Sequence, residues 1–126
     1  MELGECYQII TPPNGRHWFV VSIQITEERF LLFPFTSKKS NSDSSCVLYP
    51  GEDAPGFVQH ETVISYHKAI EITEVGLTSG LQRGYYNKAG IVSQDLLNKI
   101  LKAGLTSKFT RNKWKPLIEK MLTEHF

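Results

Sequence analysis

The sequence predicts a mainly β fold with a helical tail, within the α+β class. Between Cys6 and Thr73 the apolar residues come in short runs of strand length, separated by turn-forming residues. Further along, apolar residues recur at the spacing of amphipathic helices. A chain of 126 residues can bury one core, so we expect one domain. Residues 1–77 are expected to form a small antiparallel β-barrel, and residues 78–126 a loop followed by C-terminal helices.

Six short strands are predicted in the first part of the chain. They cover residues 5–10, 18–25, 29–36, 45–49, 62–66 and 69–73. Residues 11–15 read Thr-Pro-Pro-Asn-Gly and predict a rigid turn. Residues 24–28 suit a tight hairpin, so the second and third strands should be antiparallel neighbours. A closed or nearly closed barrel would leave none of these strands with an unpaired edge.

The helices are predicted from caps and apolar spacing. Residues 78–90 contain three glycines and predict a long connection. Ser93 is a suitable N-cap for a helix with one apolar face that ends at Gly104. Pro116 suits the first turn of a final helix over about residues 115–124.

Charge and composition limit the classes of function. Fourteen Lys and Arg against thirteen Asp and Glu give a net charge of +1, so any basic surface must be local. No apolar run approaches the roughly 20 residues of a membrane span, and the acidic start of the chain is unlike a secretory signal. We therefore expect a cytoplasmic protein without a membrane partner. Cys6 and Cys46 are expected to be buried thiols, and the scattered histidines predict neither a metal site nor a cofactor.

Two strand ends carry groups suited to phosphate chemistry. Arg16 lies just before the second predicted strand and Thr36 ends the third, so antiparallel pairing brings both to one rim of the barrel. A guanidinium binds phosphate oxygens in a bidentate way, and cleavage of a phosphodiester without a metal needs such a cation and groups that move two protons. Alternatively, Arg16 is a solvated strand-start residue and Thr36 a turn former.

The residues after Arg16 add to this candidate site. His17 carries a side chain that titrates near neutrality and can share the acid–base work. Trp18 can stack on an unpaired base. The alternatives are an exposed turn histidine and a tryptophan that belongs to the core.

Four blocks of sequence form a wider pattern. They are residues 4–7 (Gly-Glu-Cys-Tyr), 16–22 (Arg-His-Trp-Phe-Val-Val-Ser), 33–37 (Phe-Pro-Phe-Thr-Ser) and 61–70 (Glu-Thr-Val-Ile-Ser-Tyr-His-Lys-Ala-Ile). In order and spacing they resemble the MazF/PemK family of ribonuclease toxins from toxin–antitoxin systems. The resemblance covers about residues 4–77 and implies an SH3-like barrel.

The resemblance also implies an activity and partners. It implies a homodimer that cleaves single-stranded RNA without a metal and is neutralised by a cognate antitoxin. Arg16 and Thr36 take the positions of the catalytic residues, with attack of the 2′-hydroxyl giving a 2′,3′-cyclic phosphate and a 5′-hydroxyl. Arg16 would stabilise the developing charge and is also a candidate proton donor to the leaving oxygen. Thr36 would orient the phosphate, and His17 is the third catalytic candidate.

The expected RNA contacts lie around these residues. They are Trp18, Ser37, Lys38, His67 and Lys68. Only one end of the fifth predicted strand can share the Arg16 rim. By the family pattern we expect it to be the end at His67 and Lys68, and we treat His60 as a loop residue.

The competing hypothesis is a non-catalytic SH3-like module. Its apolar groove, rimmed by Trp18, Phe57 and Tyr85, would bind a peptide or another protein. DNA is not an expected partner, because the link between the two C-terminal helices is too long for a helix-turn-helix. Replacement of Arg16 would distinguish the two hypotheses, since a peptide groove should be largely indifferent to it.

Overall fold

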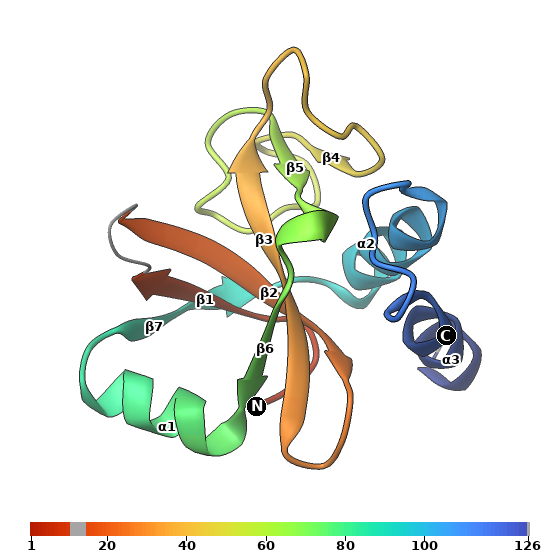
Figure 1. Cartoon of the computed structure of the whole chain (residues 1–126). Helices are drawn as coiled ribbons and strands as arrows, with labels where there is room; N and C mark the ends of the chain where they lie inside the picture. Colours follow the sequence, from red (N-terminus) through yellow and green to blue (C-terminus); the bar gives the residue numbers. More distant parts are fainter. Residues whose placement is uncertain (11–14, 126) are drawn as a thin grey trace.

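A computed structural model of the chain describes residues 1–10 and 15–125 (Figure 1). Its strands are β1 (Glu5–Ile10), β2 (Arg16–Gln24), β3 (Arg29–Ser37), β4 (Val47–Leu48), β5 (Thr62–Ile64), β6 (Ile70–Thr73) and β7 (Tyr86–Ile91). Its helices are the 3₁₀ turn η1 (Tyr66–Lys68), α1 (Glu74–Gln82), α2 (Gln94–Thr106) and α3 (Lys115–His125). The turn predicted over residues 11–15 lies outside the described residues except for Gly15, which has a φ of +87°.

The strands form one antiparallel sheet in the order β4-β5-β3-β2-β1-β7, with β6 added beside β3. The long strand β3 pairs with β2 along one edge. Along the other edge it pairs with β6 near its start and with β5 at its end. The mainly antiparallel β class with added helices was therefore predicted correctly.

Closure of the sheet into a barrel is not confirmed. The path of paired strands begins at β4 and ends at β7, and no ladder joins these two edges within the described residues. β4 is only two residues long, shorter than the strand predicted over residues 45–49. β5 also ends early, because the chain enters the η1 turn at Tyr66.

The connection predicted after β6 is wrong. Thr73 caps α1, because its hydroxyl accepts a hydrogen bond from the backbone N–H of Gly76 at 3.0 Å. After α1 the chain forms β7, which pairs with β1. The expected boundary after residue 77 falls inside α1, and residues 78–126 contribute a strand to the sheet as well as helices.

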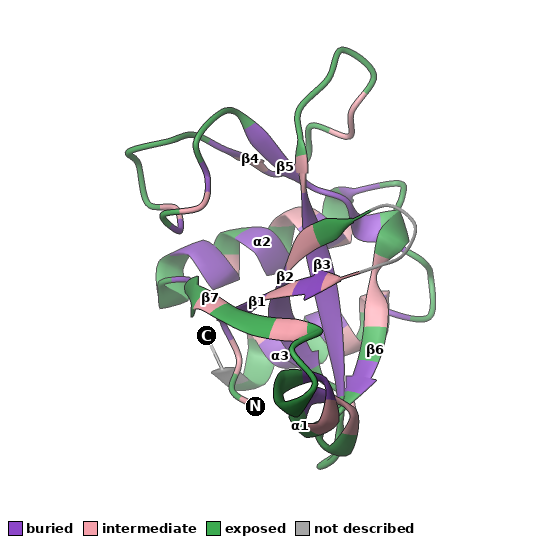
Figure 2. Cartoon of the chain, turned by 90° about the vertical axis from the view of Figure 1, so that its left-hand side faces the viewer, coloured by how far each residue is buried: buried purple, intermediate pink, exposed green. Residues whose placement is uncertain are grey.

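The sheet buries residues on both faces, as the alternation along β2 shows. Val20 packs into a cluster with Phe33 of β3 and with α2 and α3, whereas Phe19 and Leu32 face a second cluster that includes Leu77 of α1. Figure 1 shows α2 and α3 on one side of the sheet and α1 on the other. Figure 2 shows the buried length of β3 at the centre of the molecule and the mostly exposed edge strand β7.

The two C-terminal helices agree with the prediction at their starts. Ser93 caps α2, and its hydroxyl accepts from the N–H of Leu96 at 3.0 Å. The helix continues two residues beyond Gly104, which is buried. A Cβ at this position would lie 3.0 Å from the ring of Tyr66, so this glycine allows close packing and does not end the helix.

Two further features bear on the sequence predictions. Cys6 and Cys46 are buried free thiols, as expected. Burial, together with the neighbouring carboxylate of Glu5, raises the pKa of Cys6 to about 12. None of the helices that the structure describes is both long and apolar enough to cross a bilayer.

Candidate functional site

A cavity of about 360 Å³ opens where β2 begins and β3 ends. The register Trp18↔Phe35 brings these two strand ends together. The lining residues are Arg16, His17, Trp18, Phe35, Thr36, Ser37, Lys39, Phe57, His60 and Thr62. The structure thus places Arg16 and Thr36 in the same cavity, as the expected strand pairing requires, while their catalytic roles stay predictions.

The ionisable side chains that are described in the lining of this cavity are all basic. Its ionisable lining residues are Arg16, His17, Lys39 and His60, and no carboxylate is among the described residues that line it. Arg16 and Lys39 are exposed and His17 is half-buried. Two fixed cations and two imidazoles without an acidic partner favour an anionic ligand such as a phosphodiester.

Aromatic rings form one wall of the cavity. The rings of Trp18 and Phe57 stack with their centroids 5.4 Å apart and their planes at 12°. Phe35 packs edge-on against Phe57 at 5.0 Å. Trp18 is half-buried, so it is both part of the packing and a surface that a ligand can reach. This wall beside the cations could stack an unpaired base.

His60 belongs to this cavity, which the sequence reasoning missed. Its Nε2 lies 2.7 Å from the Oγ of Ser37 at the end of β3. His60 lies beside Ser37 because β5 pairs with the end of β3, with Ser37 opposite Thr62. This pairing brings the residue two positions before Thr62 beside Ser37. The end of β5 at the Arg16 cavity is thus that of His60.

His67 and Lys68 line a second cavity of about 310 Å³. Both cavities contact Thr36, Ser37 and Lys39, so the two hollows lie next to one another at the end of β3. The predicted contacts His67 and Lys68 are therefore neighbours of the Arg16 cavity and do not line it.

The second cavity has a mixed lining that includes Phe109, which is partly exposed. The rings of His67 and Phe109 are 5.9 Å apart, and the Nζ of Lys108 lies 5.4 Å from the centroid of Phe109. Asp43 also lines it. Burial raises the pKa of this carboxyl, but hydrogen bonds from Ser107 and Ser45 outweigh that effect and hold the pKa below its usual value.

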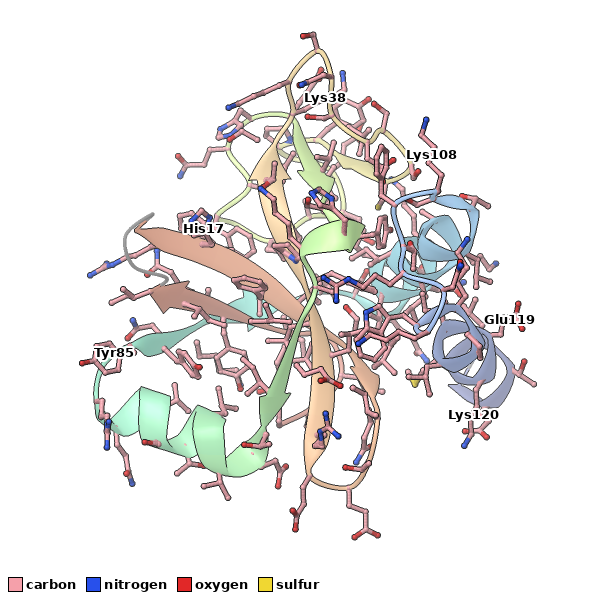
Figure 3. The ribbon with its side chains drawn as sticks, in the orientation of Figure 1. His17, Lys38, Tyr85, Lys108, Glu119 and Lys120 are labelled. Atoms are coloured by element: carbon pink, nitrogen blue, oxygen red, sulfur yellow. The ribbon has the colours of Figure 1, made fainter. Side chains whose placement is uncertain are left out.

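Lys38 lies apart from both cavities. Its Nζ is 3.6 Å from a carboxylate oxygen of Glu61, and it is not among the residues that line either hollow. Figure 3 shows Lys38 beyond the end of β3 and His17 near the start of β2. The same view places Tyr85 near the start of β7, and Tyr85 does not line the cavity that holds Trp18 and Phe57.

Within the described residues, no group of three or more His, Cys, Asp and Glu side chains is placed to hold a metal ion. The comparisons with known proteins found no family model that matches the chain and no curated protein that is significantly similar to it.

Proposed function

We propose that this protein is an endoribonuclease that cleaves single-stranded RNA without a metal ion. The observation that carries the proposal is the cavity at the ends of β2 and β3, where Arg16, Thr36 and two histidines meet with no carboxylate among the described lining residues. The aromatic wall of Trp18 and Phe57 beside these groups supports a substrate with unstacked bases.

The proposed reaction uses the substrate's own 2′-hydroxyl as the nucleophile. The 2′-oxygen attacks the adjacent phosphorus and the bond to the 5′-oxygen breaks, which leaves a 2′,3′-cyclic phosphate and a 5′-hydroxyl. Arg16 binds the non-bridging oxygens and stabilises the charge that develops on them. Thr36, half-buried at the end of β3, orients the phosphate through its hydroxyl. Ser37 and Lys39 border both cavities, so the scissile phosphate would lie there with one nucleoside on each side.

The wider proposal is a toxin of the MazF/PemK type that acts in the cytoplasm. It is supported by the resemblance of the four sequence blocks and by the order of short antiparallel strands, which is compatible with an SH3-like barrel. It includes a homodimer and a cognate antitoxin as partners. Light scattering of the purified protein tests the dimer, and co-expression with a candidate antitoxin, followed by an RNA cleavage assay, tests inhibition.

The peptide-binding hypothesis has less support. It needs Trp18, Phe57 and Tyr85 around one apolar groove, and Tyr85 lies outside the cavity that the other two line. The lining is also rich in cations and imidazoles, which a groove for an apolar peptide does not require.

The experiment is incubation of long single-stranded RNA with the purified protein in excess EDTA. Wild type should give discrete cuts with cyclic phosphate ends, and Arg16→Ala and Thr36→Ala should each lose them. Arg29→Ala is the matched control, because Arg29 is an exposed arginine at the other end of β3, paired with Glu71 at 2.9 Å. Intact RNA with wild-type protein, or full activity of Arg16→Ala, would overturn the proposal.

A further inference from the structure

Two histidines from separate segments of the chain line the Arg16 cavity. His17 comes from β2, and His60 comes from the segment before β5. The role inferred for these two imidazoles rests on the proposed ribonuclease function.

The orientation of His60 is set by contacts on both its side chain and its backbone. The Nε2 atom lies 2.7 Å from the Oγ of Ser37, and the hydroxyl of Thr62 donates to the backbone carbonyl of His60 at 2.9 Å. Ser37 and Thr62 are themselves partners in the β3–β5 ladder. His60 is exposed in the loop before β5, and these two contacts hold its imidazole beside Ser37 before a ligand arrives.

The proposed reaction requires two proton transfers. The 2′-hydroxyl must lose a proton as its oxygen bonds to phosphorus, and the departing 5′-oxygen must gain one as its bond to phosphorus breaks. Imidazole is the side chain that most readily does both at neutral pH, as a base when neutral and as an acid when protonated. The cavity holds two imidazoles and no carboxylate among its described lining residues.

We propose that His60 and His17 are the acid–base pair of this site, one taking the proton of the 2′-hydroxyl and the other giving a proton to the 5′-oxygen. The proton and bond counts balance without any further reactant. Ser37 is a positioning residue that holds the ring of His60. Sequence resemblance pointed to Arg16 and Thr36, whereas the assignment of His60 comes from the geometry of the β3–β5 pairing.

Among the described residues, the ionisable groups that line the cavity with His60 are Arg16, His17 and Lys39. Arg16 and His17 face the cavity from β2, and Lys39 faces it from the segment after β3. Glu61, next to His60 in the chain, pairs with Lys38 at 3.6 Å. The pH dependence of cleavage is thus expected to report the two imidazoles.

The first test is the pH profile of kcat/KM on a short RNA, in EDTA. Wild type should give a bell-shaped profile with one acidic and one basic limb. His60→Gln keeps an amide that can bond to Ser37 but cannot titrate in this range, so it should lose about 10²- to 10⁴-fold in rate and one limb of the bell. His17→Gln should lose the other limb. Ser37→Ala should lower the rate less and keep both limbs.

A second substrate assigns the roles. When the 5′-oxygen at the cleavage site is replaced by sulfur, the leaving group departs without protonation. The variant that lacks the acid should then recover most of the wild-type rate, and the variant that lacks the base should not. Rescue of both variants, or of neither, would overturn the assignment of His60 and His17 as one acid and one base.

The outcomes separate this inference from the function on which it rests. If wild type produces no cyclic phosphate, the ribonuclease proposal fails and this inference fails with it. If wild type cuts RNA and Arg16→Ala does not, but His60→Gln keeps the wild-type rate or both limbs, the inference alone is wrong. Thermal unfolding of each variant shows that a loss of rate is not a loss of fold.

Discussion

The hydroxyl group of Tyr66 donates a 2.6 Å hydrogen bond to the backbone carbonyl oxygen of Ile100. Tyr66 lies in the η1 turn directly after β5, and Ile100 lies within α2. Tyr66 is fully buried, and its ring also packs edge-on against Phe33 of β3 at 5.0 Å. This contact attaches the β5–η1 segment, which contributes lining residues to both cavities, to the helical side of the core.

Tyr66→Phe should destabilise the protein by about 0.5–1.5 kcal/mol, because it removes this buried hydrogen bond and keeps the ring. Urea unfolding measures the change. Tyr85→Phe is the control, since Tyr85 is 52% exposed, and it should shift stability by less than about 0.5 kcal/mol. Equal effects of the two substitutions would show that the Tyr66–Ile100 bond contributes nothing.

The Glu5–Lys88 pair joins β1 to the edge strand β7 at 2.7 Å and should make stability depend on pH. Burial of Glu5, which is 8% exposed, raises its pKa. The hydrogen bond and charge of Lys88 and the backbone N–H of Glu2 outweigh this effect, and the pKa of Glu5 falls below its ordinary value of 4.5. The stabilisation is therefore fully present above that value and is lost as the pH falls through the lowered pKa.

Glu5→Gln should accordingly lower the melting temperature at about pH 7, and the difference from wild type should shrink as the pH falls below 4.5 and through the lowered pKa of Glu5. Melting curves over this range measure it. The control is Glu71→Gln, which removes an exposed carboxylate that pairs with Arg29. A difference for Glu5→Gln that stays constant at all pH values would contradict the assignment of the effect to this ionised pair.

Phe109 should contribute to RNA affinity at the second cavity. Phe109→Ala is expected to weaken binding of a single-stranded RNA by about 1–3 kcal/mol, or about 5- to 150-fold, the usual value of one stacked base. A 2′-O-methyl RNA, which lacks the attacking hydroxyl, allows the measurement without cleavage.

Tyr49→Ala is the matched control for Phe109→Ala. Both aromatic residues are 42% exposed, but Tyr49 lines a hollow that contains Glu52, Asp53 and Asp95. An acidic hollow of this kind repels RNA, so Tyr49→Ala should leave the affinity unchanged. Equal losses for the two variants would remove Phe109 from the proposed RNA path.

Gly80 allows α1 to pack on β7. A Cβ at this position would overlap the ring of Tyr86. Alanine normally stabilises a helix relative to glycine, whereas Gly80→Ala should cost about 1–3 kcal/mol because of this overlap. Gly56→Ala is the comparison, because a methyl group there meets nothing within 4 Å. A more stable Gly80→Ala protein would show that α1 does not press on Tyr86.

Local sequence signals predicted the parts of the fold that depend on neighbours in the chain. The apolar runs that form β2 and β3, the hairpin between them and the cap at Ser93 are all present in the structure. α1 was missed because Gly76 and Gly80 weaken its helical signal and few of its residues are buried. β7 was missed because it is a half-exposed edge strand whose residues are mixed in character.

The candidate site likewise contains residues that could be predicted from the sequence and one that could not. Arg16 and Thr36 could be brought together from the sequence, because their strands are joined by a short hairpin. His60 could not be placed in the site from the sequence, because its position depends on the pairing of β5 with β3 across a long connection that contains β4. A pairing between segments so far apart leaves no local pattern in the residues themselves.

The described residues that line the Arg16 cavity all lie between positions 16 and 62. The core beneath β2 and β3 is completed by Leu97 and Ile100 of α2 and by Ile118 of α3. During synthesis the ribosome therefore releases all the cavity residues well before the helices that support them. A nascent chain can contain all the described residues that line the cavity before the core that holds them in place is complete. Any activity of this site should therefore begin only once α2 and α3 have been made.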